Sequence, residues 1–144
     1  MRISRLTTSI YPKFRGNDNK REIVQKEFYS NGKISLIREK SGACEYHYEN
    51  GGRHFRIEAD GTEKGWYING AQSYIKYPNG IIKSFHQNGK LRSISRPDRS
   101  FENWDEEGIL RFEKLEDGTT ITYPTKDIKI ITHPDGKIEK IKND

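Results

Sequence analysis

The sequence predicts an all-β fold: a single-layer antiparallel β-meander of about twelve strands, built from 19-residue hairpin repeats. Three observations predict it: a column of large side chains at a fixed interval of 19, a glycine column four residues later, and a second turn inside each period. No insertion interrupts the interval, so one structural unit is copied about six times. The side-chain column is Phe28, His47, Trp66, Phe85, Trp104 and Tyr123.

Turn signals recur every nine or ten residues along the chain. A strand of about five to seven residues plus a short turn fits that spacing, whereas helices need longer intervals between stops. Asn-Gly and Asp-Gly pairs supply many of these turns, and they tolerate the positive φ angles of hairpins. The expected turn positions are 32, 42, 51, 61, 70, 80, 89, 98, 108, 118, 127 and 136.

The segments between the turns are rich in β-forming residues. Examples are residues 34–37, 73–77 and 119–123. No segment of the sequence shows the periodicity of a helix. Prolines stand at turn entries, where a lost ladder donor costs least. Each interval therefore predicts one strand, and each period predicts one hairpin.

The alternative fold for a two-strand repeat of this length is a β-solenoid, in which each repeat is one coil and the strands stack in parallel. A solenoid must fill its narrow interior with apolar residues at every inward position. One column breaks that requirement, which favours the meander: it holds Ile34, Arg53, Gln72, Leu91, Leu110 and Lys129.

The composition leaves little material for a closed core. Hydrophobic residues make up 31% and charged residues 33%, with a mean hydropathy of −1.00, whereas ordinary domains are about 45–50% apolar. The 11% aromatic content and the regular turns argue against disorder. A single-layer sheet reconciles the low apolar content with an ordered fold, because ladders of neighbouring side chains then replace a closed core. We expect the gaps between the column side chains to be filled by Leu36, Phe55, Tyr74, Phe112 and Ile131.

The net charge of +5 arises entirely from the first 21 residues, which hold six basic residues and one acidic residue. Residues 22–144 hold twenty of each sign. We therefore expect a poorly structured basic N-terminal arm over 1–21 and a repeat β-sheet domain over 22–144. A neutral sheet argues against nucleic acid as the partner, because phosphate binding requires clustered cations.

The arm also bears on localisation. Its basic, Ser- and Thr-bearing, acid-poor start weakly resembles a mitochondrial presequence. No apolar run is long enough for a signal peptide or a membrane span. We therefore expect a cytoplasmic protein without membrane contact, with a mitochondrial location as the alternative.

No residue pattern predicts catalysis, a cofactor or a metal. Cys44 is the only cysteine, which excludes an internal disulfide and fits a reducing compartment. The four histidines share no metal-ligand spacing, and the phosphate-loop and nucleophile-elbow motifs are missing from the sequence. His47 belongs to the side-chain column, so we expect it to pack. The sequence predicts that the protein is not an enzyme.

Several turns resemble the C-terminal G-box domain of centriole-assembly proteins, also called the T-complex-protein-10-like domain. The matching strings are YPNG at 77–80, HPDG at 133–136, ADG at 59–61 and QNG at 87–89. The resemblance covers about residues 28–142. It implies a lone antiparallel sheet whose face binds a proline-rich peptide of a partner.

Two further strings resemble the MORN-variant repeats, a family that includes small bacterial proteins described as toxin–antitoxin components. They are Tyr29-Ser30-Asn31-Gly32-Lys33-Ile34 and Tyr48-Glu49-Asn50-Gly51. This resemblance implies an antitoxin-like binding protein.

The sequence thus predicts a non-enzymatic protein–protein interaction module that binds a partner segment on an aromatic sheet face or at an edge strand. The alternatives are a bacterial immunity or antitoxin-type protein that neutralises a toxin, and a structural subunit of a larger assembly. The identity of the partner and the oligomeric state are left open. Large aromatics dominate binding energy, so the expected partner-binding residues are Trp66, Tyr67, Tyr74, Tyr77, Phe85 and Trp104.

Overall fold

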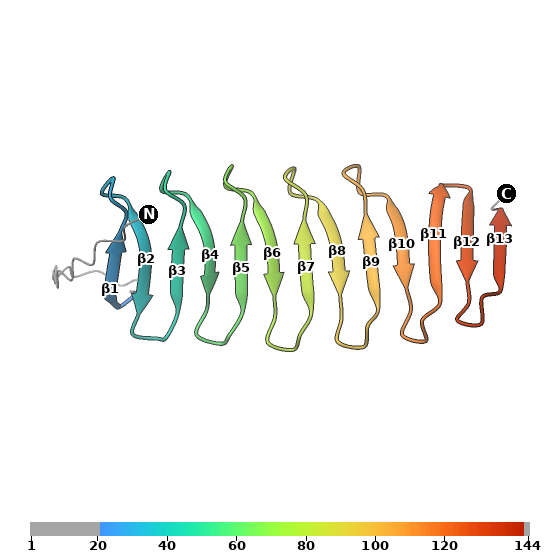
Figure 1. Ribbon diagram of the computed structural model, residues 1–144, viewed down its shortest axis with the longest axis horizontal. Helices are drawn as coiled ribbons and strands as arrows, with labels where there is room; N and C mark the ends of the chain where they lie inside the picture. Colours follow the sequence, from blue (N-terminus) through green and yellow to red (C-terminus); the bar gives the residue numbers. More distant parts are fainter. Residues whose placement is uncertain (1–20, 143–144) are drawn as a thin grey trace. The chain divides into compact units, whose positions relative to one another are not determined.

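The computed structural model describes residues 21–142 and confirms the antiparallel meander. Strand order follows the sequence (Figure 1), and the described residues form no helix. The strands are β1 (Ile23–Phe28), β2 (Ile34–Glu39), β3 (Cys44–His47), β4 (Arg53–Ile57), β5 (Glu63–Trp66), β6 (Gln72–Lys76), β7 (Ile82–Phe85), β8 (Leu91–Ser95), β9 (Phe101–Trp104), β10 (Leu110–Lys114), β11 (Thr120–Thr125), β12 (Ile128–Thr132) and β13 (Ile138–Lys142).

Residues 21–142 form thirteen strands, one more than the dozen or so expected. The reason is geometric, because each turn separates two strands and twelve turns therefore bound thirteen. The expected basic arm lies outside the described residues except for Arg21.

The described strands fall into two compact units, divided between residues 72 and 73. The first unit holds β1 to β5, and the second holds β6 to β13, with the boundary at the start of β6. Each unit is treated by itself below. A single domain over residues 22–144 stays a prediction.

The turns repeat one hydrogen-bonding pattern. In the first, Tyr29 donates its N–H to Lys33 O at 2.8 Å, and Gly32 donates to Tyr29 O at 3.0 Å. Gly32 has a φ of 81°, and Asn31 accepts a bond from Lys33 N through its Oδ1 at 2.9 Å. Only the glycine of the Asn-Gly pair takes a positive φ. The turn is therefore a type I turn closed by a left-handed glycine, which adds a bulge to the hairpin.

Two turns differ from the others. The turn between β8 and β9 keeps the same hydrogen bonds, but Arg99 occupies the glycine position with a φ of 71°. Between β11 and β12, Thr125 pairs directly with Ile128, so a two-residue turn replaces the longer one.

A β-bulge recurs where β1, β3, β7 and β9 pair with the even strand that follows each of them. Tyr46 pairs with Phe55, but the next residue, His47, pairs with Arg53, so His54 is the extra residue. The shifts beside Phe28, Phe85 and Trp104 are of the same kind. Because one extra residue reverses which face the following side chains occupy, the bulge sets the faces of these four hairpins.

Within each unit, the side-chain column lies on one face, which we call the column face. In the first unit, one row of paired residues crosses the strands and consists of Leu36, Tyr46, Phe55 and Gly65. His47 directly follows Tyr46 in the sequence, and Trp66 directly follows Gly65. In the second unit the row is Tyr74, Ser84, Ser93, Asn103, Phe112 and Thr122, followed by Phe85, Trp104 and Tyr123. Successive side chains of a strand alternate between faces, so the column lies opposite both rows.

This register corrects the expectation that intervening residues fill the gaps in the column. Leu36, Phe55 and Phe112 lie on the opposite face, because the bulge adds a residue between them and the column. Tyr74 also lies there, because it pairs with Ser84, the residue before Phe85. Only Ile131 shares the face of the column, since it pairs with Ile121, two residues before Tyr123. The opposite face instead builds its own ring contacts, as in the stacking of Tyr46 on Phe55 at 4.2 Å.

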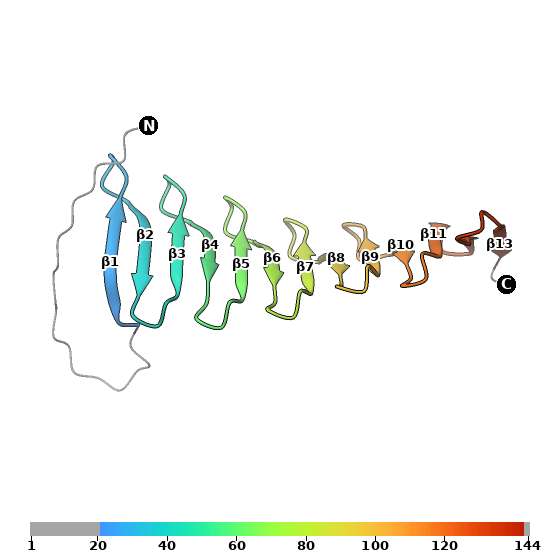
Figure 2. The same ribbon diagram turned by 60° about the horizontal axis from the view of Figure 1, so that its bottom comes forward.

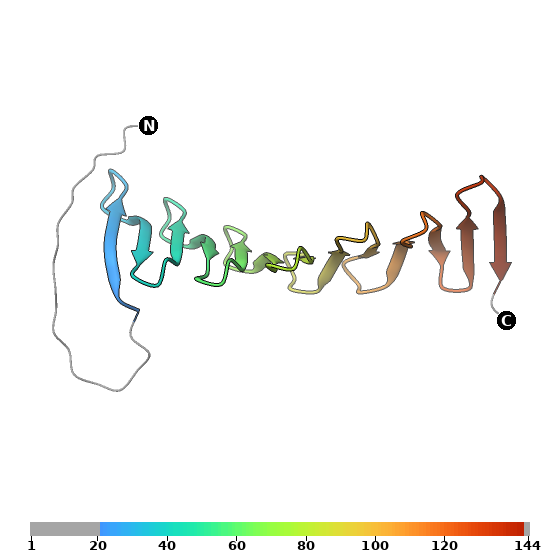
Figure 3. The ribbon, with the colours of Figure 1, turned by 90° about the horizontal axis from the view of Figure 1, so that it is seen from below.

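The burial confirms a single layer within each unit. No described side chain is less than 2% exposed, and the most buried apolar residues are Leu36, Ile37, Ala43 and Cys44 on β2, β3 and the turn between them. Figure 2 shows the strands of each unit uncovered by any other described element. Figure 3 shows the same from below. Both faces of each unit are therefore open.

Replacement of Gly80 by alanine tests the turn geometry. Gly80 has a φ of 85°, and an added Cβ would lie 2.9 Å from Pro97 Cγ. Gly89 has nearly the same φ of 84°, but its Cβ would meet open space. We expect Gly89→Ala to lower the free energy of unfolding by about 1–2 kcal/mol from the φ strain alone. Gly80→Ala should cost more, measured by urea unfolding, and equal losses would contradict this explanation.

Candidate functional site

The column side chains are held at the ends of odd-numbered strands, where the bulge leaves a backbone carbonyl available. Tyr48 donates its hydroxyl to Trp66 O at 2.7 Å, and Tyr29 donates likewise to His47 O. In the second unit, His86 Nε2 lies 2.9 Å from Trp104 O and must be the donor, since a carbonyl only accepts. Each bond joins one repeat to the next, so the column is fixed by the repeat that precedes it.

The structure divides the six predicted partner-binding residues. Trp66 lies on the column face of the first unit, and Phe85 and Trp104 lie on that of the second. Tyr74 pairs with Ser84 and lies on the opposite face. Tyr67 and Tyr77 begin turns, where each donates its N–H to a carbonyl four residues on, and Lys83 Nζ lies 5.9 Å from the Tyr77 ring. Their role in binding stays a prediction.

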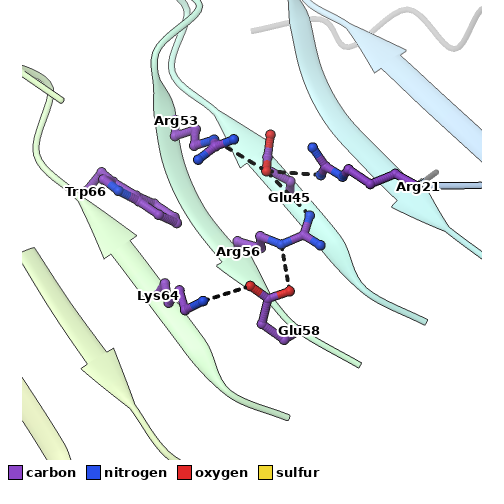
Figure 4. Close-up of a pocket in the computed structure, with 7 residues that line it drawn as sticks. All are labelled: Arg21, Glu45, Arg53, Arg56, Glu58, Lys64 and Trp66. Carbon is purple, nitrogen blue, oxygen red and sulfur yellow. Dashed lines mark hydrogen bonds and ion pairs between the residues drawn. The ribbon is translucent and has the colours of Figure 1, made fainter. Parts of the chain in front are cut away.

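A charged pocket lies on the column face of the first unit. A row of paired residues crosses β2 to β5 there, from Ile37 through Glu45 and Arg56 to Lys64. The pocket has a volume of about 280 Å³. Figure 4 shows the residues that line it: Arg21, Glu45, Arg53, Arg56, Glu58, Lys64 and Trp66.

Arg56 is the centre of an ion-pair network in the floor of this pocket. Its guanidinium contacts Glu39 at 2.8 Å, Glu45 at 3.4 Å and Glu58 at 2.8 Å. The side chains of Glu39 and Glu45 are only 6% and 3% exposed. Buried carboxylates require such partners, so the network stabilises the first unit and orients the residues at its rim.

The network also shifts ionisation. The Arg56 hydrogen bond, followed by the one from Arg21, lowers the pKa of Glu39 to about 2 against the opposing effect of burial. Hydrogen bonds from Lys64 and Arg56 outweigh burial at Glu58 and lower its pKa. Both carboxylates are therefore charged at neutral pH.

The sequence reasoning did not identify this pocket, although one signal for it was visible. Ile34, Leu91 and Leu110 pair with the column aromatics Phe28, Phe85 and Trp104, but the equivalent partner of His47 is Arg53. The position of Arg53 is apolar in three of the six repeats, so a charged residue there is a departure that the sequence shows.

Among residues 21–142, no three His, Cys, Asp or Glu side chains are grouped so that they could hold a metal ion. The part of the chain that the structure describes has no helix long and apolar enough to cross a membrane.

Comparisons with known proteins agree with the two resemblances read from the turns. A family model described as the MORN repeat variant matches residues 21–38 and 75–96. Among curated proteins, none matches.

Solved structures of TCP10 domains are similar to this chain. A mutant of the TCP10 domain of Danio rerio CPAP is 20% identical, with 83% of this chain and 78% of that chain covered and a TM-score of 0.47. The TCP10c domain of Drosophila melanogaster Sas-4 is 20% identical, with coverages of 82% and 91% and a TM-score of 0.45. The SAS-4 TCP domain in complex with a proline-rich motif of Ana2 is 17% identical, with coverages of 92% and 99% and a TM-score of 0.41. The suspected resemblance is thereby confirmed.

Removal of one hydroxyl tests the bond that fixes Trp66. Tyr48→Phe loses the bond to Trp66 O, and we expect the free energy of unfolding to fall by about 1 kcal/mol. Tyr46→Phe is the matched control, because among the described residues the Tyr46 hydroxyl makes no hydrogen bond. Urea unfolding measures both variants. An equal effect of the two changes would show that the bond to Trp66 contributes nothing.

Acid titration tests the buried carboxylate. Because the pKa of Glu39 falls from 4.5 to about 2 on folding, its contribution is fully present above pH 4.5 and is lost as pH falls toward about 2. We expect Glu39→Gln to destabilise the protein at neutral pH by about 1–3 kcal/mol, and the difference from wild type to shrink through that window. Glu22→Gln, which breaks the exposed pair with Lys40, is the control and should change little. A pH-independent difference would refute the assignment.

Proposed function

We propose that this protein is a non-enzymatic interaction module that binds an extended segment of a partner protein on the column face. The observation that carries the proposal is that the column side chains are large, fixed and only half-buried. Large aromatics that keep an exposed surface are the residues that dominate binding energy at protein interfaces.

The spacing of the column suits an extended peptide. Column residues lie on alternate strands, which places neighbours about 9.6 Å apart within a unit. An extended segment advances about 6.6–6.8 Å for every two residues, so a segment that crosses the strands obliquely can place side chains between successive column rings. Phe85, Trp104 and Tyr123 in the second unit form such a series on one face.

Preorganisation supports the same conclusion. The carbonyl bonds from the preceding repeat hold the backbone of Trp66 and Trp104 in place before any partner arrives. A surface that is already ordered loses less conformational entropy on binding, which leaves more of the contact energy as affinity.

The outer edge of β13 offers a second route. Among the described strands it pairs only with β12, and Ile138 on it is 66% exposed. An unpaired ladder and an exposed apolar side chain are what an added strand requires. Binding there would not depend on the column.

Peptide display with tryptophan variants tests the face. Peptides selected on the wild-type chain from a phage library of random peptides should bind Trp66→Ala or Trp104→Ala about tenfold more weakly or worse, measured by fluorescence anisotropy. Tyr74→Ala is the matched control, since it removes a large ring from the opposite face. Circular dichroism of each variant establishes that the sheet is retained.

The outcomes separate the candidate surfaces. Equal losses in Tyr74→Ala and Trp104→Ala would contradict the assignment to the column face. Peptides that ignore both tryptophans but protect the β13 amides from hydrogen exchange would move the site to the edge. If no peptide were selected, the interaction function itself would be refuted.

A further inference from the structure

Arg53 and Trp66 form one wall of the charged pocket in the first unit. The Arg53 guanidinium carbon lies 5.6 Å from the centre of the Trp66 ring, a cation–π arrangement (Figure 4). Arg53 Nε lies 3.5 Å from Glu45 Oε2, and the Arg53 side chain is 53% exposed. The guanidinium is thus positioned by a ring and a carboxylate, while half of its surface faces solvent.

The other cations of the pocket are more fully engaged. Arg56 contacts three carboxylates, Arg21 contacts Glu39 and Glu45, and Lys64 contacts Glu58 at 3.0 Å. Within residues 21–142, the two terminal nitrogens of Arg53 have no hydrogen-bond acceptor. They carry donors in a planar fork, which is the geometry that grips the two oxygens of a carboxylate.

The charge count leaves room for one anion. Four cations and two carboxylates line the pocket, and Glu39 lies behind Arg56, so the cations exceed the carboxylates by one. A volume of about 280 Å³ is below the range of about 300–1,000 Å³ typical of small-molecule sites. One acidic side chain with its stem fits this size and this charge.

We propose that the pocket binds the carboxylate of an Asp or Glu residue in the partner segment, with Arg53 as the gripping residue and the Trp66 ring as the support for the acidic side chain's stem. The inference rests on the proposed function, because it names one residue of the segment that the column face receives. Arg56 and its carboxylates position Arg53 through Glu45 and do not themselves grip the ligand.

A polyanion fits the pocket poorly. Glu45 and Glu58 alternate with the cations, and the Glu58 side chain is 28% exposed. Successive phosphates of a nucleic acid would meet these carboxylates, whereas phosphate tracking requires cations without intervening acids. A single anionic group beside Arg53 avoids them.

Peptide selection, followed by a pair of peptides that differ only in one acidic side chain, tests the proposal with the full chain. Phage-displayed peptides selected on wild type, but not on Arg53→Gln, should share an Asp or Glu at one position. One such peptide and its version with the acid replaced by the amide are then titrated by anisotropy. Arg53→Gln should weaken the acidic peptide about tenfold or more and leave the amide peptide unchanged. Arg53→Lys should bind the acidic peptide more tightly than Arg53→Gln does and more weakly than wild type does. Lysine keeps the charge but lacks the planar fork of donors.

Arg38→Gln is the matched control, since it removes the same charge from the opposite face of the same unit. Selected peptides without acids, or equal losses for both peptides, would overturn the carboxylate assignment. Tight binding of a fluorescent oligothymidine that Arg53→Gln abolishes would assign the pocket to nucleic acid instead. Peptides that depend on Trp66 but not on Arg53 would refute this inference and leave the proposed function standing. Peptides that depend on none of Arg53, Trp66 and Trp104 would refute both this inference and the assignment of binding to the column face.

Discussion

The recurring β-bulge is the constraint on which the rest of the structure depends. In the hairpins that begin with β1, β3, β7 and β9, the even strand carries one extra residue opposite a column side chain. That residue reverses the faces of the even strand and leaves the column carbonyl available to a side chain from the preceding repeat. The repeats are therefore coupled through side chains as well as through the ladder. Without the bulge, the column and the intervening aromatics would share a face.

A single layer imposes a second requirement, because few of the described side chains are buried and none is less than 2% exposed. Stability must come from nearest neighbours: ring contacts on the opposite face, carbonyl bonds along the column, and charged clusters. The first unit shows the most developed cluster, in which Glu39 and Glu45 are buried beneath Arg56 and Arg21. The same openness leaves the rings of Trp66, Phe85 and Trp104 partly exposed. The proposed binding would thus use side chains that also stabilise the sheet.

Much of the fold could be predicted from the sequence, because Asn-Gly and Asp-Gly spacing determines where strands end. The faces could not. Counting residues from Phe28 to Leu36 places both on one face, and only the extra residue opposite Phe28 reverses that result. Three of the six predicted site residues, Trp66, Phe85 and Trp104, lie on the column face. Tyr74 lies on the opposite face because it pairs with Ser84 rather than with Phe85, a register that residue spacing alone does not give. The charged pocket depends on pairing between β2, β3, β4 and β5, so Arg53 at an apolar repeat position was its one visible signal.

The central claim is that the column face receives a protein segment, and nuclear magnetic resonance tests it most directly. The chain has two tryptophans, Trp66 and Trp104, one in each unit, so two indole N–H signals report on the column face. Titration of the labelled protein with a selected peptide should shift at least one of these signals, together with amides of the adjoining odd strands. Shifts confined to the opposite-face residues Tyr46, Phe55 and Phe112, with both indoles unmoved, would contradict the account.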